Sequence, residues 1–336
     1  MSSPRQTEIV LTWMNRVIID DIAPHLVGLS YTDVLAGEAD DLAIEVEDRD
    51  ALWSGPWQPA KGDACEVTIK ASPWCTNVEE LYTGIFSHDK ISLSGPPSRV
   101  SLRCVSAPLA SGLRRKTHTR AWQSVTLKQI ATDIAQSAGL ALQYEAAPGA
   151  PYKRRDQKNK SNLAFLQELC EKAGQAIKVY DGKIVIFDEI ERDAQPATCE
   201  INLSGGRVLS WSFDGDTSAR YGSCRVSCTN PRSGKKLVGT FTDPTNRDGQ
   251  TLEVVHHADS LGEAQSMARA MLFNANRFAT SGRLSVVGDC GLVAGTNFNL
   301  VNARGFDGKF VITKATHYAV GGYRVELDVR RCVEGY

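Results

Sequence analysis

Carboxylates gather near the N-terminal end of the chain. The stretch from Asp33 to Asp50 holds eight Asp or Glu residues and one arginine. A pair of carboxyl groups can serve as general acid and base, as in glycoside hydrolysis, when an apolar pocket raises the pKa of one of them. Glu45 and Glu47, however, alternate with apolar residues, which places them on the solvent-facing side of a strand. We therefore interpret the run as a solvated surface, with an interface to a neighbouring protein as the alternative.

Basic residues form two groups in the middle third of the chain. The groups are Arg114, Arg115 and Lys116 with His118 and Arg120, and Lys153, Arg154 and Arg155 with Lys158 and Lys160. Such runs can bind phosphate backbones. The interleaved aromatic side chains of a single-strand-binding protein are missing, however, since only Trp122 and Tyr152 are nearby. We interpret both groups as solvated loops or protein interfaces; the alternative is a positive wall along a channel through which DNA passes.

The other residues capable of chemistry lack the spacing of a catalytic or metal site. His256 and His257 are adjacent, and neighbours in a strand point to opposite faces. Cys224 and Cys228 share a face of an expected strand but lie about 13 Å apart at strand rise, too far to share a metal. His317 is expected to be packed or interface-forming. No G-x-S-x-G elbow, P-loop or H-E-x-x-H motif occurs, so the sequence predicts no catalytic residue, metal or cofactor.

Composition narrows the class of protein. The chain has 336 residues, of which 42% are hydrophobic, and a formal net charge of −1. A chain of this size can bury more than one core, so we expect two or three domains. The near-neutral charge argues against a generally nucleic-acid-binding or membrane-surface protein. Met1 to Thr7 is polar and no apolar run is typical of a signal peptide or membrane span, so we expect a chain that is cytosolic when made.

The nine cysteines include no C-x-x-C pair. In a cytosolic chain of this size they are expected to be free thiols in strand and helix cores.

The N-terminal third is expected to consist mostly of strands. Alternating apolar and polar residues predict strands at 41–47 and 65–70, and further strands at 81–88 and 100–105. Several short strands at this spacing favour a closed barrel or a sandwich, because closure removes exposed sheet edges.

The middle third changes to helices and a hairpin. Helical periodicity with terminal signals predicts one helix between Thr126 and Gly139 and a second between Ser161 and Gly174. Residues 176–187 are then typical of a β-hairpin, because Asp181-Gly182 at its centre favours a type I′ turn.

The C-terminal third returns to strands around one amphipathic helix. The helix is expected at 260–278, with Ser260 as N-cap and Glu263 at the third position of a capping box. Strands are expected at 208–213, 221–229, 236–242, 251–257, 283–289, 297–302, 309–318 and 323–330. The two β regions are candidates for structural repeats, although the sequence itself shows no repeat.

Short sequence words along this order are similar to those of a known family. They are Asp40-x-Leu42-x-Ile44, Gly62-Asp63, Tyr82-x-Gly84, Gly95-Pro96-Pro97, the helix from Ser161-Asn162 to Gly174, Val287-Gly288-Asp289, Phe306 to Ile312, and Gly321 to Leu327. Their order resembles the phage late control D family of contractile-tail baseplate hub proteins, which are related to the N-terminal part of type VI secretion spike proteins. One departure is the segment 71–77, where a tight glycine turn is expected.

The resemblance implies an α+β, mainly β fold, in which two small tube-protein-like β-barrel domains flank a mixed α/β middle (clamp) domain. The domains are expected at 1–110, 111–204 and 205–336. The implied function is structural: a homotrimeric baseplate hub whose ring of six similar barrels matches a threefold spike to the sixfold tail tube. Its location would be the virion tail baseplate, after assembly in the bacterial host cytoplasm.

The partners implied are a trimeric tail spike, a tail tube initiator or tube protein and baseplate wedge proteins, with the tape-measure protein as a further candidate. DNA would meet the hub only in transit, and no membrane is involved. The candidate interface or channel-lining residues are Arg114, Arg115, Lys116, Lys153, Arg154 and Arg155.

Two other classes of function stay open from the residues alone. A tail-tip cell-wall hydrolase would need a cleft with paired carboxylates of unequal pKa, but the resemblance extends from about Asp33 to Arg330 and leaves little chain for a separate hydrolase domain. A carbohydrate-binding module would cluster exposed aromatic side chains on one sheet face, and Trp53, Trp57 and Trp74 are the candidates.

Overall fold

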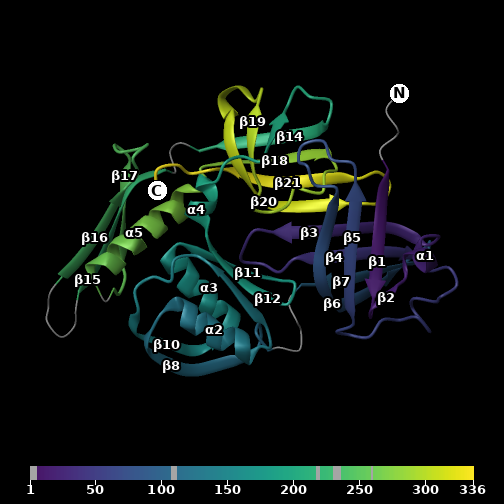
Figure 1. The fold of residues 1–336 in the computed structure, drawn as a ribbon, viewed down its shortest axis with the longest axis horizontal. Helices are drawn as coiled ribbons and strands as arrows, with labels where there is room; N and C mark the ends of the chain where they lie inside the picture. Colours follow the sequence, from purple (N-terminus) through teal and green to yellow (C-terminus); the bar gives the residue numbers. More distant parts are fainter. Residues whose placement is uncertain (1–5, 107–111, 217–219, 230–235, 259) are drawn as a thin grey trace.

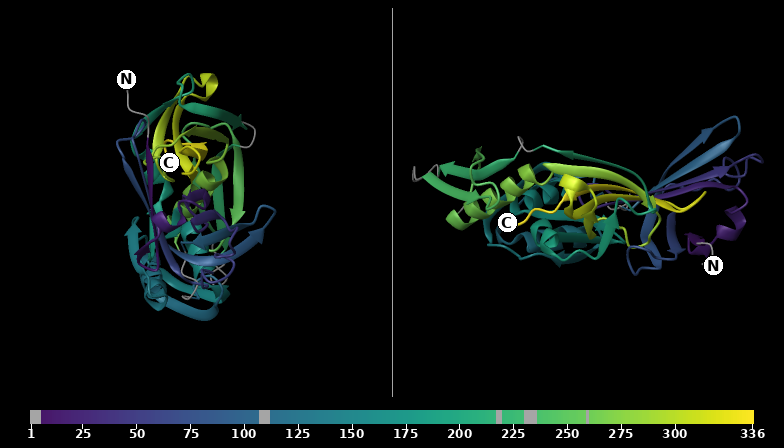
Figure 2. Two further views of the ribbon diagram at one scale, coloured as in Figure 1. Left: turned by 90° about the vertical axis from the view of Figure 1, so that its right-hand side faces the viewer. Right: turned by 90° about the horizontal axis from the view of Figure 1, so that it is seen from above.

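The computed structural model describes residues 6–106, 112–216, 220–229, 236–258 and 260–336. The fold is α+β and mainly β, as predicted, and the molecule is elongated (Figures 1 and 2). Seen from above in Figure 2, the N-terminal strands lie at one end, and the strands β15–β17 with helix α5 lie at the other.

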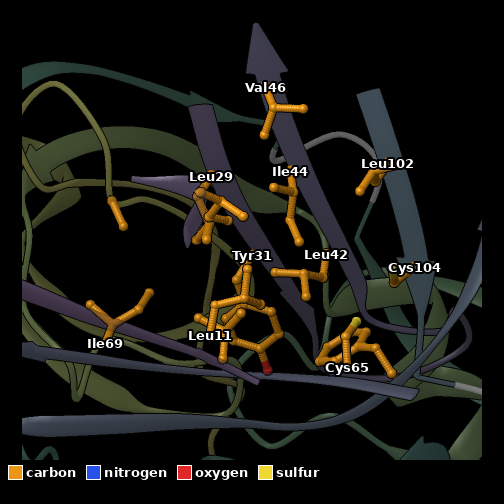
Figure 3. Packing of buried hydrophobic residues seen from close by; sticks show 14 of the residues in the cluster. Leu11, Leu29, Tyr31, Leu42, Ile44, Val46, Cys65, Ile69, Leu102 and Cys104 are labelled. Atoms are coloured by element: carbon orange, nitrogen blue, oxygen red, sulfur yellow. The ribbon is translucent and has the colours of Figure 1, made fainter. Parts of the chain in front are cut away.

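The first β unit (residues 7–105) is a sheet that curls around one core. Its pairing order is β3-β4-β7-β6-β5-β1-β2. The elements are β1 Thr7–Trp13, β2 Arg16–Val17, α1 Ile19–Ile22, β3 Leu26–Val34, β4 Asp41–Glu47, β5 Ala64–Ala71, β6 Glu80–Ser94 and β7 Arg99–Val105. Alternate residues point inward, so Tyr31, Leu42, Cys65 and Leu102 from four different strands pack together (Figure 3). The strands predicted at 41–47, 65–70, 81–88 and 100–105 are confirmed.

The middle unit (residues 117–194) packs two helices on a three-stranded sheet and a two-stranded ribbon. Its elements are β8 Thr117–Val125, α2 Leu127–Ser137, β9 Ala141–Glu145, β10 Tyr152–Ser161, α3 Asn162–Ala173, β11 Gln175–Tyr180, β12 Lys183–Asp188 and α4 Glu189–Ala194. Both predicted helices are confirmed, with side-chain N-caps at Thr126 and Ser161. Gly174 ends α3 at φ 71°, a left-handed conformation that favours glycine.

The predicted hairpin is also confirmed. Strands β11 and β12 pair around Asp181 and Gly182, whose φ values of 47° and 69° fit the type I′ turn.

The second β unit (residues 199–215 and 280–331) extends the same sheet. It contains β13 Cys199–Asn202, β14 Val208–Gly215, β18 Thr280–Val287, β19 Asn297–Val301, the 3₁₀ turn η2 Arg304–Phe306, β20 Gly308–Tyr318 and β21 Arg324–Arg331. The strand β20 pairs antiparallel with β3, with Lys314 opposite Val34 and Tyr318 opposite Ser30. The two β units therefore form one continuous 13-stranded sheet (Figure 1).

An insert (residues 221–276) lies between β14 and β18. It is a separate three-stranded sheet of β15 Tyr221–Thr229, β16 Lys236–Thr242 and β17 Gln250–Val255, covered by α5 Leu261–Asn276. The helix starts at the predicted N-cap, where the Ser260 hydroxyl accepts from the Glu263 N–H at 3.2 Å. At Gly239 in β16, a Cβ would lie 2.3 Å from the backbone of Ala264, so glycine allows the helix to approach.

Candidate interaction surfaces

The six predicted basic interface residues lie at the two ends of one β-ribbon. Arg114, Arg115 and Lys116 form an exposed turn before β8, whereas Lys153, Arg154 and Arg155 begin β10. The strands β8 and β10 are antiparallel, with Thr117 opposite Ser161 and Val125 opposite Tyr152. The two groups are therefore separated by most of the ribbon, roughly 25 Å at strand rise. The structure does not bring them together, and the expectation of a loop is wrong for residues 153–155.

Two residues of the second basic group, Arg154 and Arg155, make contacts within the chain. The Arg154 guanidinium lies 2.8 Å from Asp156. Arg155 pairs with Glu263 at the start of α5 and lies 4.0 Å over the ring of Tyr152, so it connects the middle unit to the insert. In the described parts of the chain, no carboxylate lies within ion-pair distance of the other four residues, which are exposed: Arg114, Arg115, Lys116 and Lys153.

A groove separates the middle unit from the insert. Its volume is about 640 Å³, and its walls come from α3, the start of β10, the segment 147–151 and α5. Lys153 and Arg269 lie on opposite walls beside apolar side chains such as Leu169 and Met267. The groove thus places two of the predicted basic residues, Lys153 and Arg155, at a concave surface.

Three residues of the acidic run are buried, which corrects the expectation of a uniformly solvated surface. Glu45 is exposed as predicted, but Asp33, Asp40 and Asp48 are almost fully buried. Asp48 has a local role, because its carboxylate accepts from the N–H groups of Trp53 and Ser54 at 2.9 and 3.1 Å.

Asp33, Asp40 and Lys178 form what we call the acidic joint. The Lys178 ammonium, from β11, pairs with Asp33 and lies 3.0 Å from Asp40. Asp33 also accepts from the Ala294 N–H of the second β unit at 2.8 Å. The side chains are 15%, 7% and 0% exposed for Lys178, Asp33 and Asp40. The acidic joint therefore fastens all three units at one buried point.

The acidic joint holds two carboxylates but only one cation. Burial, opposed by the Lys178 charge and assisted by Asp33, raises the pKa of Asp40 to about 7. A carboxyl group that titrates near neutrality is the kind of group that general acids use. Here it is enclosed among structural partners: the Val34 N–H donates to Asp40 at 3.0 Å, and the Asp40 N–H donates to Ser106 at 3.0 Å.

A second buried ion cluster, the arginine joint, fastens α4 to the second β unit. Arg330 of β21 is 1% exposed and binds Asp193 through both terminal nitrogens, at 2.6 and 2.9 Å. The same guanidinium lies 3.2 Å from Glu189, which also pairs with Arg277 at the end of α5. Burial opposes the charge of Arg330, but Asp193 and Glu189 hold the pKa of this guanidinium above its usual value. No local sequence pattern predicted this cluster.

Asp289 holds the segment where the sequence departs from the expected glycine turn. Its carboxylate accepts from the N–H groups of Trp74 and Cys75, both at 2.8 Å, and from the Thr76 hydroxyl. Burial alone would raise the pKa of Asp289, but these hydrogen bonds hold it below its usual value. The loop between β5 and β6 is thus clamped onto the second β unit.

The three tryptophans considered for glycan binding do not share a face. The Trp74 indole donates to the Val287 carbonyl at 2.9 Å, in the Asp289 clamp. Trp53 and Trp57 lie edge to face at 5.8 Å, and with Trp13 they line a cavity of about 400 Å³ at the end of the first β unit. The structure therefore separates Trp74 from the other two.

His317, Cys224 and Cys228, which the sequence analysis considered for chemistry, are packed. His317 is fully buried between the rings of Tyr31 and Tyr323, and burial lowers its pKa to about 4; the prediction of a packed histidine is confirmed. Cys224 and Cys228 are buried free thiols. Across the described ranges, no group of three or more His, Cys, Asp or Glu side chains has the geometry of a metal site. Nor does any helix in those ranges have the length and apolarity to cross a membrane.

A family model and two phage proteins are similar in sequence to this chain. The family model described as "Phage tail baseplate hub (GPD)" matches residues 60–322. Proteins described as "Probable baseplate hub protein" from Escherichia phages 186 and P2 are 26% and 28% identical over 179 and 176 residues. These alignments cover 53% and 52% of this chain, but only 44% and 43% of the relatives. The matched region is therefore less than half the length of either relative.

Solved structures share the fold. A 43 kDa tail protein of prophage MuSo2 from Shewanella oneidensis has a TM-score of 0.73 at 16% identity, over 97% of this chain and 98% of the other. A tail protein from Neisseria meningitidis MC58 has a TM-score of 0.70 at 15% identity, over 96% of each chain. An Escherichia coli component of the type VI secretion system has a TM-score of 0.56 at 12% identity, over 100% and 77%.

The family match spans most of the chain, and these structural likenesses agree with it in fold. The chain belongs to the phage tail baseplate hub family.

Proposed function

We propose that this protein is the homotrimeric hub of a contractile-tail baseplate, which matches a threefold spike to the sixfold tail tube. The observation that carries the proposal is the pair of β units joined in one sheet. Three copies would supply six such units, and a ring of six similar units can meet a sixfold tube while the assembly keeps threefold symmetry. The family match supports the hub role.

We further propose the division of labour along the chain. The domains 1–110 and 205–336 build the ring, and the domain 111–204 reaches outward as a clamp. The exposed residues Arg114, Arg115, Lys116 and Lys153 serve as contacts for baseplate wedge proteins or as channel lining. The spike and the tube initiator or tube protein are the axial partners, and the assembly takes place in the host cytoplasm before the hub becomes part of the virion.

The role we propose is structural rather than enzymatic. A hydrolase would need paired carboxylates, and the buried pairs in the described parts of the chain are Asp33 with Asp40 and Glu189 with Asp193. All four are held by cations or N–H groups that join the units. Their contacts account for their burial without a substrate.

Light scattering tests the proposal through the mass of the purified protein, alone and mixed with its spike protein. The expected mass is about 110 kDa, three times the 36.6 kDa of one chain, because the role requires closed threefold assembly. A mass of one chain in both conditions would remove the proposal. The same sample would then be assayed for peptidoglycan hydrolysis and glycan binding.

A further inference from the structure

The two β units have the same strand order when the two-residue strand β2 is left aside. Taken in chain order, the other six strands of the first unit are β1, β3, β4, β5, β6 and β7, and those of the second are β13, β14, β18, β19, β20 and β21. In both units the pairing order is second, third, sixth, fifth, fourth, first. The units differ in one pair, since β1 and β5 are antiparallel whereas β13 and β19 are parallel. Strand β14 is thus the counterpart of β3, and β6 is the counterpart of β20.

Irregularities in the strands align the two units residue by residue. The β3–β4 pairing shifts between Leu26 and Gly28, and the β14–β18 pairing shifts between Val208 and Ser210. In β3, Leu29 is the residue after Gly28 and lies opposite Ile44. In β14, Trp211 is the residue after Ser210 and lies opposite Leu284. Trp211 is therefore the counterpart of Leu29.

A second pair of irregularities aligns β6 with β20. The β6–β7 pairing shifts between His88 and Lys90, and the β20–β21 pairing shifts between Ile312 and Lys314. Residues 90–94 of β6 thus correspond to residues 314–318 of β20.

Only one of the two equivalent edges is covered within the chain. Residues 314–318 of β20 pair with β3, and Leu29 on β3 is 2% exposed. The equivalent edge of β14 has no strand beside it in the described parts of the chain, and Trp211 is 56% and Leu209 58% exposed. An uncovered edge with large apolar side chains favours pairing with another chain.

No other described strand covers the counterpart surface on the first β unit either. The C-terminal half of β6 pairs with β7 on one side, whereas its pairing with β5 ends at Ser87. Leu93 in this half is 61% exposed. Along the sheet, β14 and β6 are separated by β18, β21, β20, β3, β4 and β7 (Figure 1). The two uncovered edges therefore cannot pair with each other within one chain.

We propose that β14 of one copy pairs antiparallel with residues 90–94 of β6 in a second copy, repeating between chains the contact that β3 and β20 make within the chain. The proposal rests on the homo-oligomeric hub proposed above and names its interface. The alignment of the two β units also fixes the register. Within the chain, Lys314 lies opposite Val34 and His317 lies opposite Tyr31. The equivalent pairs between two chains are Lys90 opposite Asp216 and Leu93 opposite Phe213. An ammonium then meets a carboxylate, and two apolar side chains meet beside Trp211.

The test compares single variants of both edges with a matched control. Trp211→Arg and Leu93→Arg change side chains that are more than half exposed, so the fold should persist, which circular dichroism and thermal unfolding check. Each variant should weaken assembly by about 30-fold or more, as for a central apolar anchor, and shift the light-scattering mass toward one chain. Val255→Arg is the control, because Val255 is 87% exposed but lies on the insert.

Charge reversal tests the register. Lys90→Asp should lower the assembled fraction, and Lys90→Asp combined with Asp216→Lys should restore part of it. An unchanged mass for Lys90→Asp would overturn the register.

The outcomes separate this inference from the proposed function. If the native protein is a trimer and both Trp211→Arg and Leu93→Arg remain trimers of equal stability, the interface is wrong while the hub proposal stands. If the native protein remains a single chain even with its spike, both proposals fail.

Discussion

The two buried ion clusters, the acidic joint and the arginine joint, differ in their balance of cations and carboxylates. Each fastens a segment of the middle unit, β11 in one case and α4 in the other, to the β units. The arginine joint sets Arg330 and Arg277 against Glu189 and Asp193, so cations and carboxylates are equal in number. The acidic joint sets Lys178 alone against two carboxylates. The excess carboxylate of the acidic joint, Asp40, has a pKa of about 7, so this joint changes its protonation near neutrality.

The largest effect is expected from breaking the balanced joint. Arg330→Met leaves two buried carboxylates without their shared guanidinium, and removing one partner of a buried ion pair costs about 3–5 kcal/mol of unfolding free energy. Chemical denaturation monitored by fluorescence measures the loss. Arg283→Met is the control, because Arg283 pairs with Asp328 on the neighbouring part of the sheet but is 73% exposed, and such pairs are worth about 1 kcal/mol or less. Equal losses for the two variants would contradict the role of the arginine joint.

A smaller, pH-dependent effect is expected at the acidic joint. Lys178→Met removes the only cation, but Asp40 can remain protonated and so limit the cost. We expect a loss of about 2–3 kcal/mol at about pH 8 and a smaller loss at about pH 6. Denaturation curves for Lys178→Met at the two pH values test this, with Lys183→Met as the control because its pair with Asp181 is more exposed. A loss that is the same at both pH values would show that Asp40 does not take up the proton.

The effect that is smallest over any one pH unit is a change in the slope of the pH profile. The pKa of Asp40 is about 7 in the folded protein and 3.8 as the reference value, so between these values the folded state binds more protons. Stability from this group therefore falls as pH rises from about 4 to 7, by about 1 kcal/mol per unit. Asp40→Asn should flatten that part of the profile, measured by thermal unfolding across the range. Asp41→Asn, which alters a surface pair with Arg103, should leave the slope in place.

Local signals predicted the elements that carry them. Thr126, Ser161 and Ser260 each begin a helix as expected, because an N-cap and the periodicity that follows it are properties of neighbouring residues. The Asp181-Gly182 turn fixed its hairpin for the same reason. Alternation found β4 and β5, whose inward faces are apolar.

Features that depend on distant partners could not be predicted from local patterns. The strands β8 and β10 are mostly polar and show no regular alternation, so nothing local predicts a strand at 153–155. In the sequence, Asp33 and Asp40 resemble solvated carboxylates, because their partner Lys178 lies far along the chain. Arg330 is likewise far in sequence from its partner Asp193. No local pattern marks a side chain whose counter-ion is more than a hundred residues away. The two β regions are expected to be structural repeats from the layout of their elements, but no sequence repeat marks them, because their likeness resides in strand order rather than in residue identity.

The position of the insert shows where this fold can accommodate additional residues. In the first β unit, β3 and β4 are joined by residues 35–40, whereas the equivalent strands β14 and β18 are separated by residues 216–279. Since β14 and β18 are neighbours in the sheet, the insert leaves and returns at adjacent points, and lengthening such an excursion adds little closure entropy. Extra chain can therefore be accommodated between β14 and β18 while these paired strands keep their register.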